Sequence, residues 1–223
     1  METIEISDGV VHLVEREVTK SITLEAFKDS LRATLGFKSP ILPSNTIFYG
    51  QLEACRVYAI EQAPCVRTIN YRPDKNRNSE TFQYTIPLPW VYLIVTFHEF
   101  ALESLHVYFR GQRVKIADDV LYVAPLPNIH GDGLVCLGDL RFEITSPMEE
   151  RVEKLKRLFW DSVFNADILY SYDENMPEAI EERSGEDESF AGWERISTEE
   201  VCALPWTPYK TLSAIVGGCL NNQ

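Results

Sequence analysis

The feature that most constrains the fold is a nearly continuous apolar run, Trp90–Phe97, in the middle of the chain. Such a run, rich in β-branched and aromatic residues, is typical of a strand that is covered on both faces. Short links join it to its neighbours, so we expect an antiparallel meander with residues 72–79 as a polar hairpin tip. Six further segments have strand character: Thr46–Tyr49, Arg56–Glu61, Val66–Tyr71, Glu80–Ile86, Leu102–Arg110 and Val120–Val123.

The sequence before this block predicts a small extension and a helix. Residues 2–18 alternate loosely between apolar and polar, which predicts one or two edge strands in an N-terminal strand extension, residues 1–20. Thr23 is placed to cap a helix that ends at Gly36. The apolar stripe of this helix is Leu24, Phe27, Leu31 and Leu35.

The sequence after the block predicts three helices and one poorly structured stretch. Ser146 as the cap and Pro147 in the first turn open a helix that we expect to reach Phe164. Residues 170–196 are polar and acidic, which predicts weak structure; a solvated loop is favoured over a docking surface for a basic partner. Residues 197–204 and 208–216 predict two short helices, the second stopped by a glycine pair.

Charge and composition exclude several classes of protein. The 223 residues carry a net charge of −13 and no long basic run, so a nucleic-acid partner is not expected. No apolar run is long enough to cross a membrane, and the acidic N-terminus lacks a signal peptide, so a cytoplasmic protein without membrane contact is expected.

Cysteine and histidine spacing argues against a metal, a cofactor or a disulfide framework. The five cysteines form no Cys-x-x-Cys pair, and the four histidines are scattered. Four cysteines lie in apolar surroundings and are expected to pack as small hydrophobes: Cys55, Cys65, Cys202 and Cys219. Cys136 differs, because it stands between two glycines in a turn-rich segment, 124–138.

This segment has fixed internal spacing. Asn128 follows Pro127 and lies eight residues before Cys136, while Gly133 lies three before it. In these residues, with the turn that begins at His130, the segment resembles the active-site region of ubiquitin-conjugating enzymes. The resemblance implies an α+β, UBC-like fold over residues 1–223, a single domain. Its parts are an N-terminal helix, an antiparallel β-meander, an active-site loop and C-terminal helices with a long insertion.

The chain departs from the family pattern at several positions. Leu126 stands where the family has a histidine, and Asp139 lies one residue later than the family's acid. The segment from Trp206 to Pro208 is similar to the family's Trp-x-Pro segment but comes about 70 residues after Cys136, so residues 140–204 are expected to be a helical and acidic insertion. These departures resemble bacterial relatives that are encoded beside an activating enzyme, a ubiquitin-like protein and a JAB-type metalloprotease.

The chemistry of acyl carriage explains why a cysteine and an amide occur together. A thiolate is both a good nucleophile and a good leaving group, although an ordinary cysteine, with a pKa of about 8.5, is only partly ionised at pH 7. The resemblance implies that Cys136 carries the acyl group and that Asn128 donates to the oxyanion that forms when an amine attacks. Alternatively, Cys136 is a buried structural thiol and Asn128 only ties down the loop.

The remaining candidates have open roles. His130 and Asp139 are close to the thiol in the chain and could support it, but a surface loop residue and a turn or cap residue are the favoured interpretations. Pro127 and Gly133 would shape the loop, and Trp206 is expected in the core.

Three functions stay open. The leading one is transfer of a ubiquitin-like protein, received from an ATP-dependent activating enzyme, through a thioester on Cys136 to an amine. The second is a non-catalytic binding module of the same fold. The third is an unrelated cysteine hydrolase, which would need a positioned histidine base.

Overall fold

The computed structural model describes residues 3–7, 10–15, 18–28, 42–73, 79–99, 101–137, 146–165, 174–184 and 190–221. The chain forms two compact units, Met1–Ile41 and Leu42–Gln223, which are treated separately. None of the described helices is long and apolar enough to cross a membrane.

The first unit is a three-stranded antiparallel sheet in the order β1 (Thr3–Ser7), β2 (Val10–Glu15), β3 (Val18–Thr23). The prediction of one or two strands over residues 2–18 is confirmed by β1 and β2, and a third strand that was not predicted, β3, begins at Val18 and pairs with β2. The predicted helix cap is confirmed: residues 24–28 are helical, and Thr23 Oγ1 accepts the Ala26 N–H at 3.1 Å. The rest of the predicted helix, including Leu31 and Leu35, lies outside the described residues.

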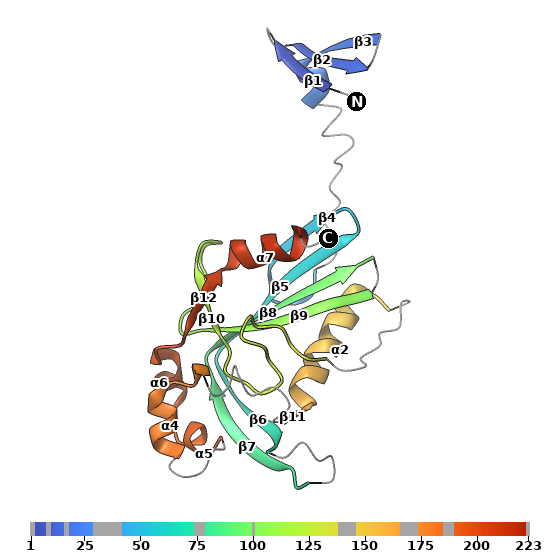
Figure 1. Ribbon diagram of the computed structural model, residues 1–223. Coiled ribbons are helices and arrows are strands. Elements are labelled where there is room, and N and C mark those ends of the chain that lie inside the picture. The colour runs from blue at the N-terminus through green and yellow to red at the C-terminus, as the bar shows by residue number, and fades with distance from the viewer. Residues whose placement is uncertain are drawn as a thin grey trace. The chain divides into compact units, whose positions relative to one another are not determined.

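The second unit is built on a six-stranded antiparallel sheet (Figure 1). The predicted antiparallel sheet is confirmed, but it is not a simple meander, because β5 pairs with β8 and the two intervening strands lie in a second sheet. Its order is β12-β10-β9-β8-β5-β4. The strands are β4 (Thr46–Leu52), β5 (Cys55–Gln62), β8 (Trp90–His98), β9 (Ala101–Arg110), β10 (Val120–Val123) and β12 (Pro208–Thr211).

The central hairpin of this sheet continues beyond a break. β6 (Cys65–Arg72) and β7 (Phe82–Leu88) pair in the same register as β5 and β8. The break falls at Pro64 and Pro89, whose missing N–H groups cannot join the ladder. The two strands therefore curl away together as a second small sheet, to which β11 (Val163–Asn165) adds in parallel beside β6 (Figure 1).

The helix after the active-site segment is shorter than predicted. α2 spans Met148–Asp161, and its N-cap is Pro147, which makes no side-chain cap bond. The predicted Ser146 cap is wrong, because no side chain caps the first turn. Ser146 contributes its carbonyl instead, which accepts the buried Arg151 Nε–H at 2.8 Å. The helix does not reach Phe164, because Ser162 is extended and the chain pairs with β6 as β11.

The acidic stretch contains helices, so the prediction of weak structure was wrong for its described part. α4 (Glu178–Ser184) and α5 (Ala191–Glu194) are followed by the predicted helix α6 (Thr198–Ala203). Apolar residues on these short helices are buried in the core of the sheet: Ile180, Phe190, Trp193, Ile196 and Val201. α5 and α6 pack on β7, and the Trp193 indole donates to the Pro87 carbonyl at 2.8 Å. The predicted insertion boundaries, 140–204, stay a prediction.

The C-terminal segment also differs from its prediction. Pro208–Thr211 forms β12, because it finds a partner in β10, and α7 (Leu212–Asn221) begins only afterwards. The helix continues through Gly217 and Gly218, which were expected to stop it.

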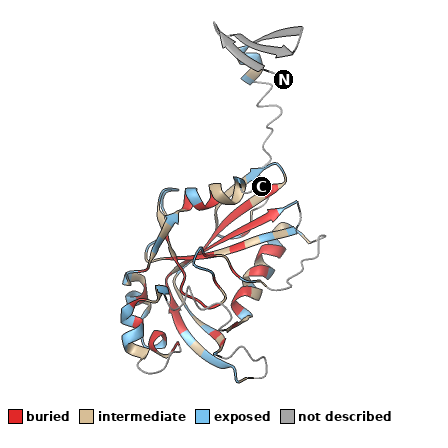
Figure 2. Cartoon of the chain, in the orientation of Figure 1, coloured by how far each residue is buried: buried red, intermediate tan, exposed pale blue. Residues whose placement is uncertain are grey.

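Two apolar cores lie on opposite faces of the main sheet, because their residues alternate along β5 and β8. Figure 2 shows the buried positions on these strands and on the helices. The larger one contains buried residues of α2, α4, α5 and α6, together with Trp206, whose predicted core position is confirmed. The smaller one lies under α7, which packs on β4 and β5. Burial of both faces explains why Trp90–Phe97 is almost wholly apolar.

Candidate active site

The segment that carries Cys136 is a short strand between two neighbours. On one side, Val107 N–H donates to the Gly133 carbonyl at 2.9 Å, and Val135 N–H to the Leu105 carbonyl at 2.8 Å. This pairing extends the sheet beyond β10 along the edge of β9. On the other side, residues 128–130 pair with residues 134–136, so the chain forms a tight hairpin.

The hairpin brings Asn128 and Cys136 directly opposite each other. The Cys136 N–H donates to the Asn128 carbonyl at 2.9 Å, and Ile129 pairs with Val135. Ile129 and Val135 are both buried in the larger core, and this burial anchors the hairpin. Because side chains alternate along a strand, the thiol of Cys136 faces away from this core.

Cys136 is exposed, and it is the most exposed of the five cysteines, all of which are free. Cys55 is buried, and the other three are half-buried. The predicted packing of Cys55 as a small hydrophobe is confirmed, since it lies in the smaller core. An exposed sulfur at the end of a braced hairpin can be reached by another protein, as acyl carriage requires.

The Asn128 side chain is already engaged by β11. Its Nδ2 donates to the Val163 carbonyl at 3.3 Å, and its Oδ1 accepts the Asn165 N–H at 3.4 Å. Asn128 also has a positive φ of 64°, a conformation in which asparagine is favoured over most residues. The amide thus ties the hairpin to β11, and its nitrogen has a second hydrogen for another acceptor.

Gly133 is required by the local geometry. Its φ is +86°, and a Cβ atom at this position would lie 2.5 Å from Tyr108 Cε1. The Tyr108 hydroxyl donates to the Asp132 carbonyl at 2.7 Å, so the ring is fixed against the turn. A glycine three residues before the thiol therefore lets the hairpin lie flat on β9.

The other predicted site residues have different surroundings. Pro127 is buried, and so is Leu126, whose side chain packs in the larger core where the family has a histidine. His130 is exposed at the turn of the hairpin. Asp139 lies outside the described residues. Among the described residues, no three histidine, cysteine or acidic side chains gather as a metal site.

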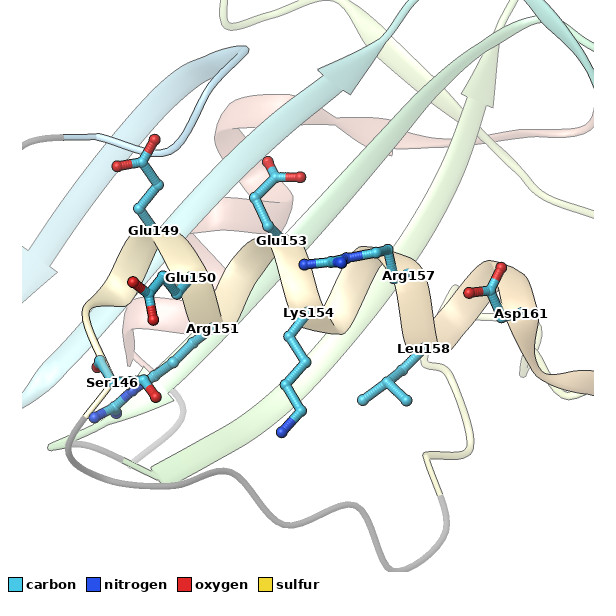
Figure 3. A pocket seen from close by; sticks show the side chains of 9 residues that line it. All are labelled: Ser146, Glu149, Glu150, Arg151, Glu153, Lys154, Arg157, Leu158 and Asp161. Atoms are coloured by element: carbon cyan, nitrogen blue, oxygen red, sulfur yellow. Dashed lines mark hydrogen bonds between the residues drawn. The ribbon is translucent and has the colours of Figure 1, made fainter.

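A hollow of about 700 Å³ beside α2 does not include any of these residues. Figure 3 shows that it is lined by Ser146 and by one face of α2 with side chains of both charges. It therefore plays no part in the candidate active site.

Sequence reasoning missed the residues of β9 that support the hairpin. His106 of β9 pairs with Leu134 of the Cys136 hairpin in an isolated bridge. The His106 imidazole is stacked parallel to the Tyr108 ring. One signal was present: along β9 the apolar residues Leu105 and Val107 alternate with Ser104 and His106. This alternation points the polar residues away from the larger core, toward the face that bears Cys136.

Comparison with known proteins agrees with this geometry. The family model described as "Prokaryotic E2 family D" matches residues 38–199, well over half of the chain, which include the whole Cys136 hairpin. No curated protein and no solved structure gives a significant match. The chain belongs to the prokaryotic E2 family D.

Proposed function

We propose that the chain accepts a ubiquitin-like protein as a thioester on Cys136 and transfers it to an amine. The observation that carries this proposal is the exposed thiol at the end of a hairpin whose other strand begins at Asn128. Membership of a prokaryotic E2 family supports the same role and implies an ATP-dependent activating enzyme as the donor. A JAB-type protease in the same pathway is an expectation from the resemblance alone.

The chemistry needs two acyl transfers. In the first, the Cys136 thiolate attacks the thioester on the activating enzyme; a new C–S bond forms, and the enzyme's thiolate leaves. In the second, an amine attacks the carbonyl carbon; the C–N bond forms, the C–S bond breaks, and Cys136 leaves with the electron pair. The first exchange is nearly isoenergetic, and the second is driven by amide formation.

Asn128 has a positioning role and can also donate in this scheme. Its bonds to Val163 and Asn165 hold the hairpin on β11. Its remaining N–H is available to the oxyanion that develops during amine attack, where loss of such a donor costs about 3–4 kcal/mol in other enzymes. Asn128→Asp keeps the acceptor for the Asn165 N–H but removes both the bond to the Val163 carbonyl and the remaining N–H, so this variant is expected to discharge slowly and to hold the hairpin less firmly on β11.

The test is a charging reaction with the activating enzyme, the ubiquitin-like protein and ATP. The wild-type chain is expected to form an adduct that a thiol reagent removes. Cys136→Ser should give either no adduct or an oxyester that resists the reagent. Cys65→Ser is the matched control, because Cys65 is half-buried on β6, and it should charge like the wild type.

The other two functions predict different results. A non-catalytic binding module would hold the modifier without any covalent adduct, even with a competent activating enzyme. A cysteine hydrolase would cleave a peptide or isopeptide without ATP. Either result would contradict thioester transfer.

A further inference from the structure

Tyr108 of β9 holds the turn of the Cys136 hairpin. Its hydroxyl donates to the Asp132 carbonyl at 2.7 Å, and its ring lies against Gly133. Burial raises the pKa of the Tyr108 hydroxyl, so this group stays protonated and remains a donor at neutral pH. The position of the turn therefore depends on the position of the Tyr108 ring.

The Tyr108 ring is contacted by a residue from the C-terminal part of the chain. Tyr209 of β12 is stacked on it, with the ring centroids 5.5 Å apart and the ring planes 16° from parallel. Tyr108 is 1% exposed, whereas Tyr209 is half-buried and packs against the smaller core. Stacked aromatic rings at this separation attract each other beyond the effect of burying their area, so Tyr209 is a support for Tyr108.

An irregularity in β12 sets the direction of the Tyr209 side chain. Pro208–Thr211 pairs with residues 120–122 of β10, so four residues of one strand lie beside three of the other. The extra residue falls in the middle of β12, where Tyr209 lies. Bulges of this kind occur next to active sites, where they redirect a side chain.

Backbone contacts at both ends fix β12 in place. Before the strand, the Val123 N–H donates to the Thr207 carbonyl at 2.9 Å. After it, the Leu212 N–H donates to the Asp119 carbonyl at 3.0 Å, and α7 continues from there onto β4 and β5. The Tyr209 ring is therefore carried by an anchored strand.

We propose that Tyr209 is a positioning residue for the Cys136 hairpin and acts through Tyr108. The Tyr209 ring keeps the Tyr108 ring in place, and the Tyr108 hydroxyl then holds the turn that leads into the strand of Cys136. The consequence for charging of Cys136 rests on the proposed function. β12 lies beyond the residues 38–199 that match the family, so this role joins a C-terminal strand to the candidate active site.

Four variants separate this role from general stability. Tyr209→Leu removes the stack, and Tyr209→Phe keeps it. Tyr108→Phe keeps the stack and removes only the bond to the Asp132 carbonyl. The matched control is Phe48→Leu, because Phe48 is another half-buried ring packed against the smaller core, and it lies on β4, at the opposite edge of the main sheet from β12.

The first measurement is amide hydrogen exchange in the hairpin of the uncharged chain, which needs no modifier. Tyr209→Leu and Tyr108→Phe should each speed exchange at residues 132–136 about tenfold, because the turn opens more often. Tyr209→Phe should restore most of the protection, and Phe48→Leu should leave it unchanged. The double variant, Tyr108→Phe with Tyr209→Leu, should exchange about as fast as the faster single variant, since both changes act through one hydrogen bond.

The second measurement is the rate at which the activating enzyme charges Cys136, followed against the concentration of the chain. It is made at a temperature where every variant is folded. Tyr209→Leu should lower kcat about fivefold with little change in KM, because the nucleophile is less well placed. Tyr209→Phe should recover most of kcat, and Phe48→Leu should charge like the wild type.

The two measurements distinguish failure of this inference from failure of the proposed function. If hairpin exchange or kcat in Tyr209→Leu equals that in Phe48→Leu, Tyr209 is no positioning residue and the inference is overturned. If exchange changes as expected but the wild type forms no thioester, the support of the hairpin by Tyr209 stands and the proposed function fails.

Discussion

At the residue scale, the local constraint in the Cys136 hairpin is the contact between Gly133 and the ring of Tyr108. Gly133 has the left-handed backbone and the missing side chain that this turn needs. Gly131, in the same turn, has open space where a Cβ atom would be. The two glycines therefore form a natural pair for mutation.

We expect Gly133→Ala to destabilise the hairpin and to slow charging of Cys136, while Gly131→Ala has little effect. An added Cβ atom must displace a ring held by its own hydrogen bond, and alanine at positive φ costs about 1–2 kcal/mol more. Thermal unfolding and the charging rate measure the two effects. Equal behaviour of the two variants would show that the hairpin does not depend on this contact.

Prediction from the sequence succeeded at the residue scale where a few neighbouring residues set the geometry. The spacing of Asn128, Gly133 and Cys136 indicated an active-site loop, and the fold makes this loop a hairpin with the first and last of them opposite each other; their catalytic roles stay a prediction. The engagement of Asn128 by β11 could not be predicted, because its partners are more than 30 residues away in the chain. The same holds for His106, which faces the hairpin from β9.

At the element scale, the strands from β4 to β10 were predictable, and the short helices α4 and α5 of the acidic stretch were not. The strands carry β-branched and aromatic residues over most of their length, so their signal is local. α4 and α5 are seven and four residues long, and acidic residues outnumber the few apolar ones that they bury. Their helical form depends on tertiary packing of Ile180 and Trp193, which a sequence pattern of this length does not show.

α6 shows that a short helix can be predicted when its cap is complete. Ser197 Oγ accepts the Glu200 N–H at 3.1 Å, and the Glu200 carboxylate accepts the Ser197 N–H at 2.8 Å. We expect Ser197→Ala to lower the free energy of unfolding by about 1 kcal/mol, because this reciprocal cap is lost. Denaturant titration measures the change, with Thr198→Ala, one residue later, as the control; equal losses would contradict the cap's contribution.

The same cap gives α6 a defined acid sensitivity. The Arg183 guanidinium, with the Ser197 N–H, lowers the pKa of Glu200 to about 2. Because the pKa is depressed in the folded state, the stabilisation is complete above the ordinary carboxyl pKa and disappears as the pH falls through about 2.

At the scale of the whole molecule, the two apolar cores on the two faces of the main sheet hold different elements in place. The larger core anchors the hairpin through Ile129 and Val135, while the smaller one fixes α7 on β4 and β5. Both cores, and every described site residue, belong to the unit Leu42–Gln223. The described start of the predicted N-terminal helix, residues 24–28, belongs to the other unit, and the prediction of a single domain over residues 1–223 stays a prediction.

This division predicts that the second unit folds without the first. A chain that begins at Leu42 should unfold at nearly the same temperature as the main transition of the full chain, because no described core residue is removed. Calorimetry of the two chains makes the comparison. A large fall in the unfolding temperature would mean that residues 1–41 stabilise the second unit.

The central claim is that the sulfur of Cys136 forms a bond to the carboxyl end of a ubiquitin-like protein. The most direct measurement is the intact mass of the chain after incubation with the activating enzyme, the modifier and ATP, followed by peptide mapping. We expect a mass increase of one modifier less one water, located on Cys136 and reversed by hydroxylamine. An unchanged mass with a competent activating enzyme, or an adduct on another residue, would contradict it.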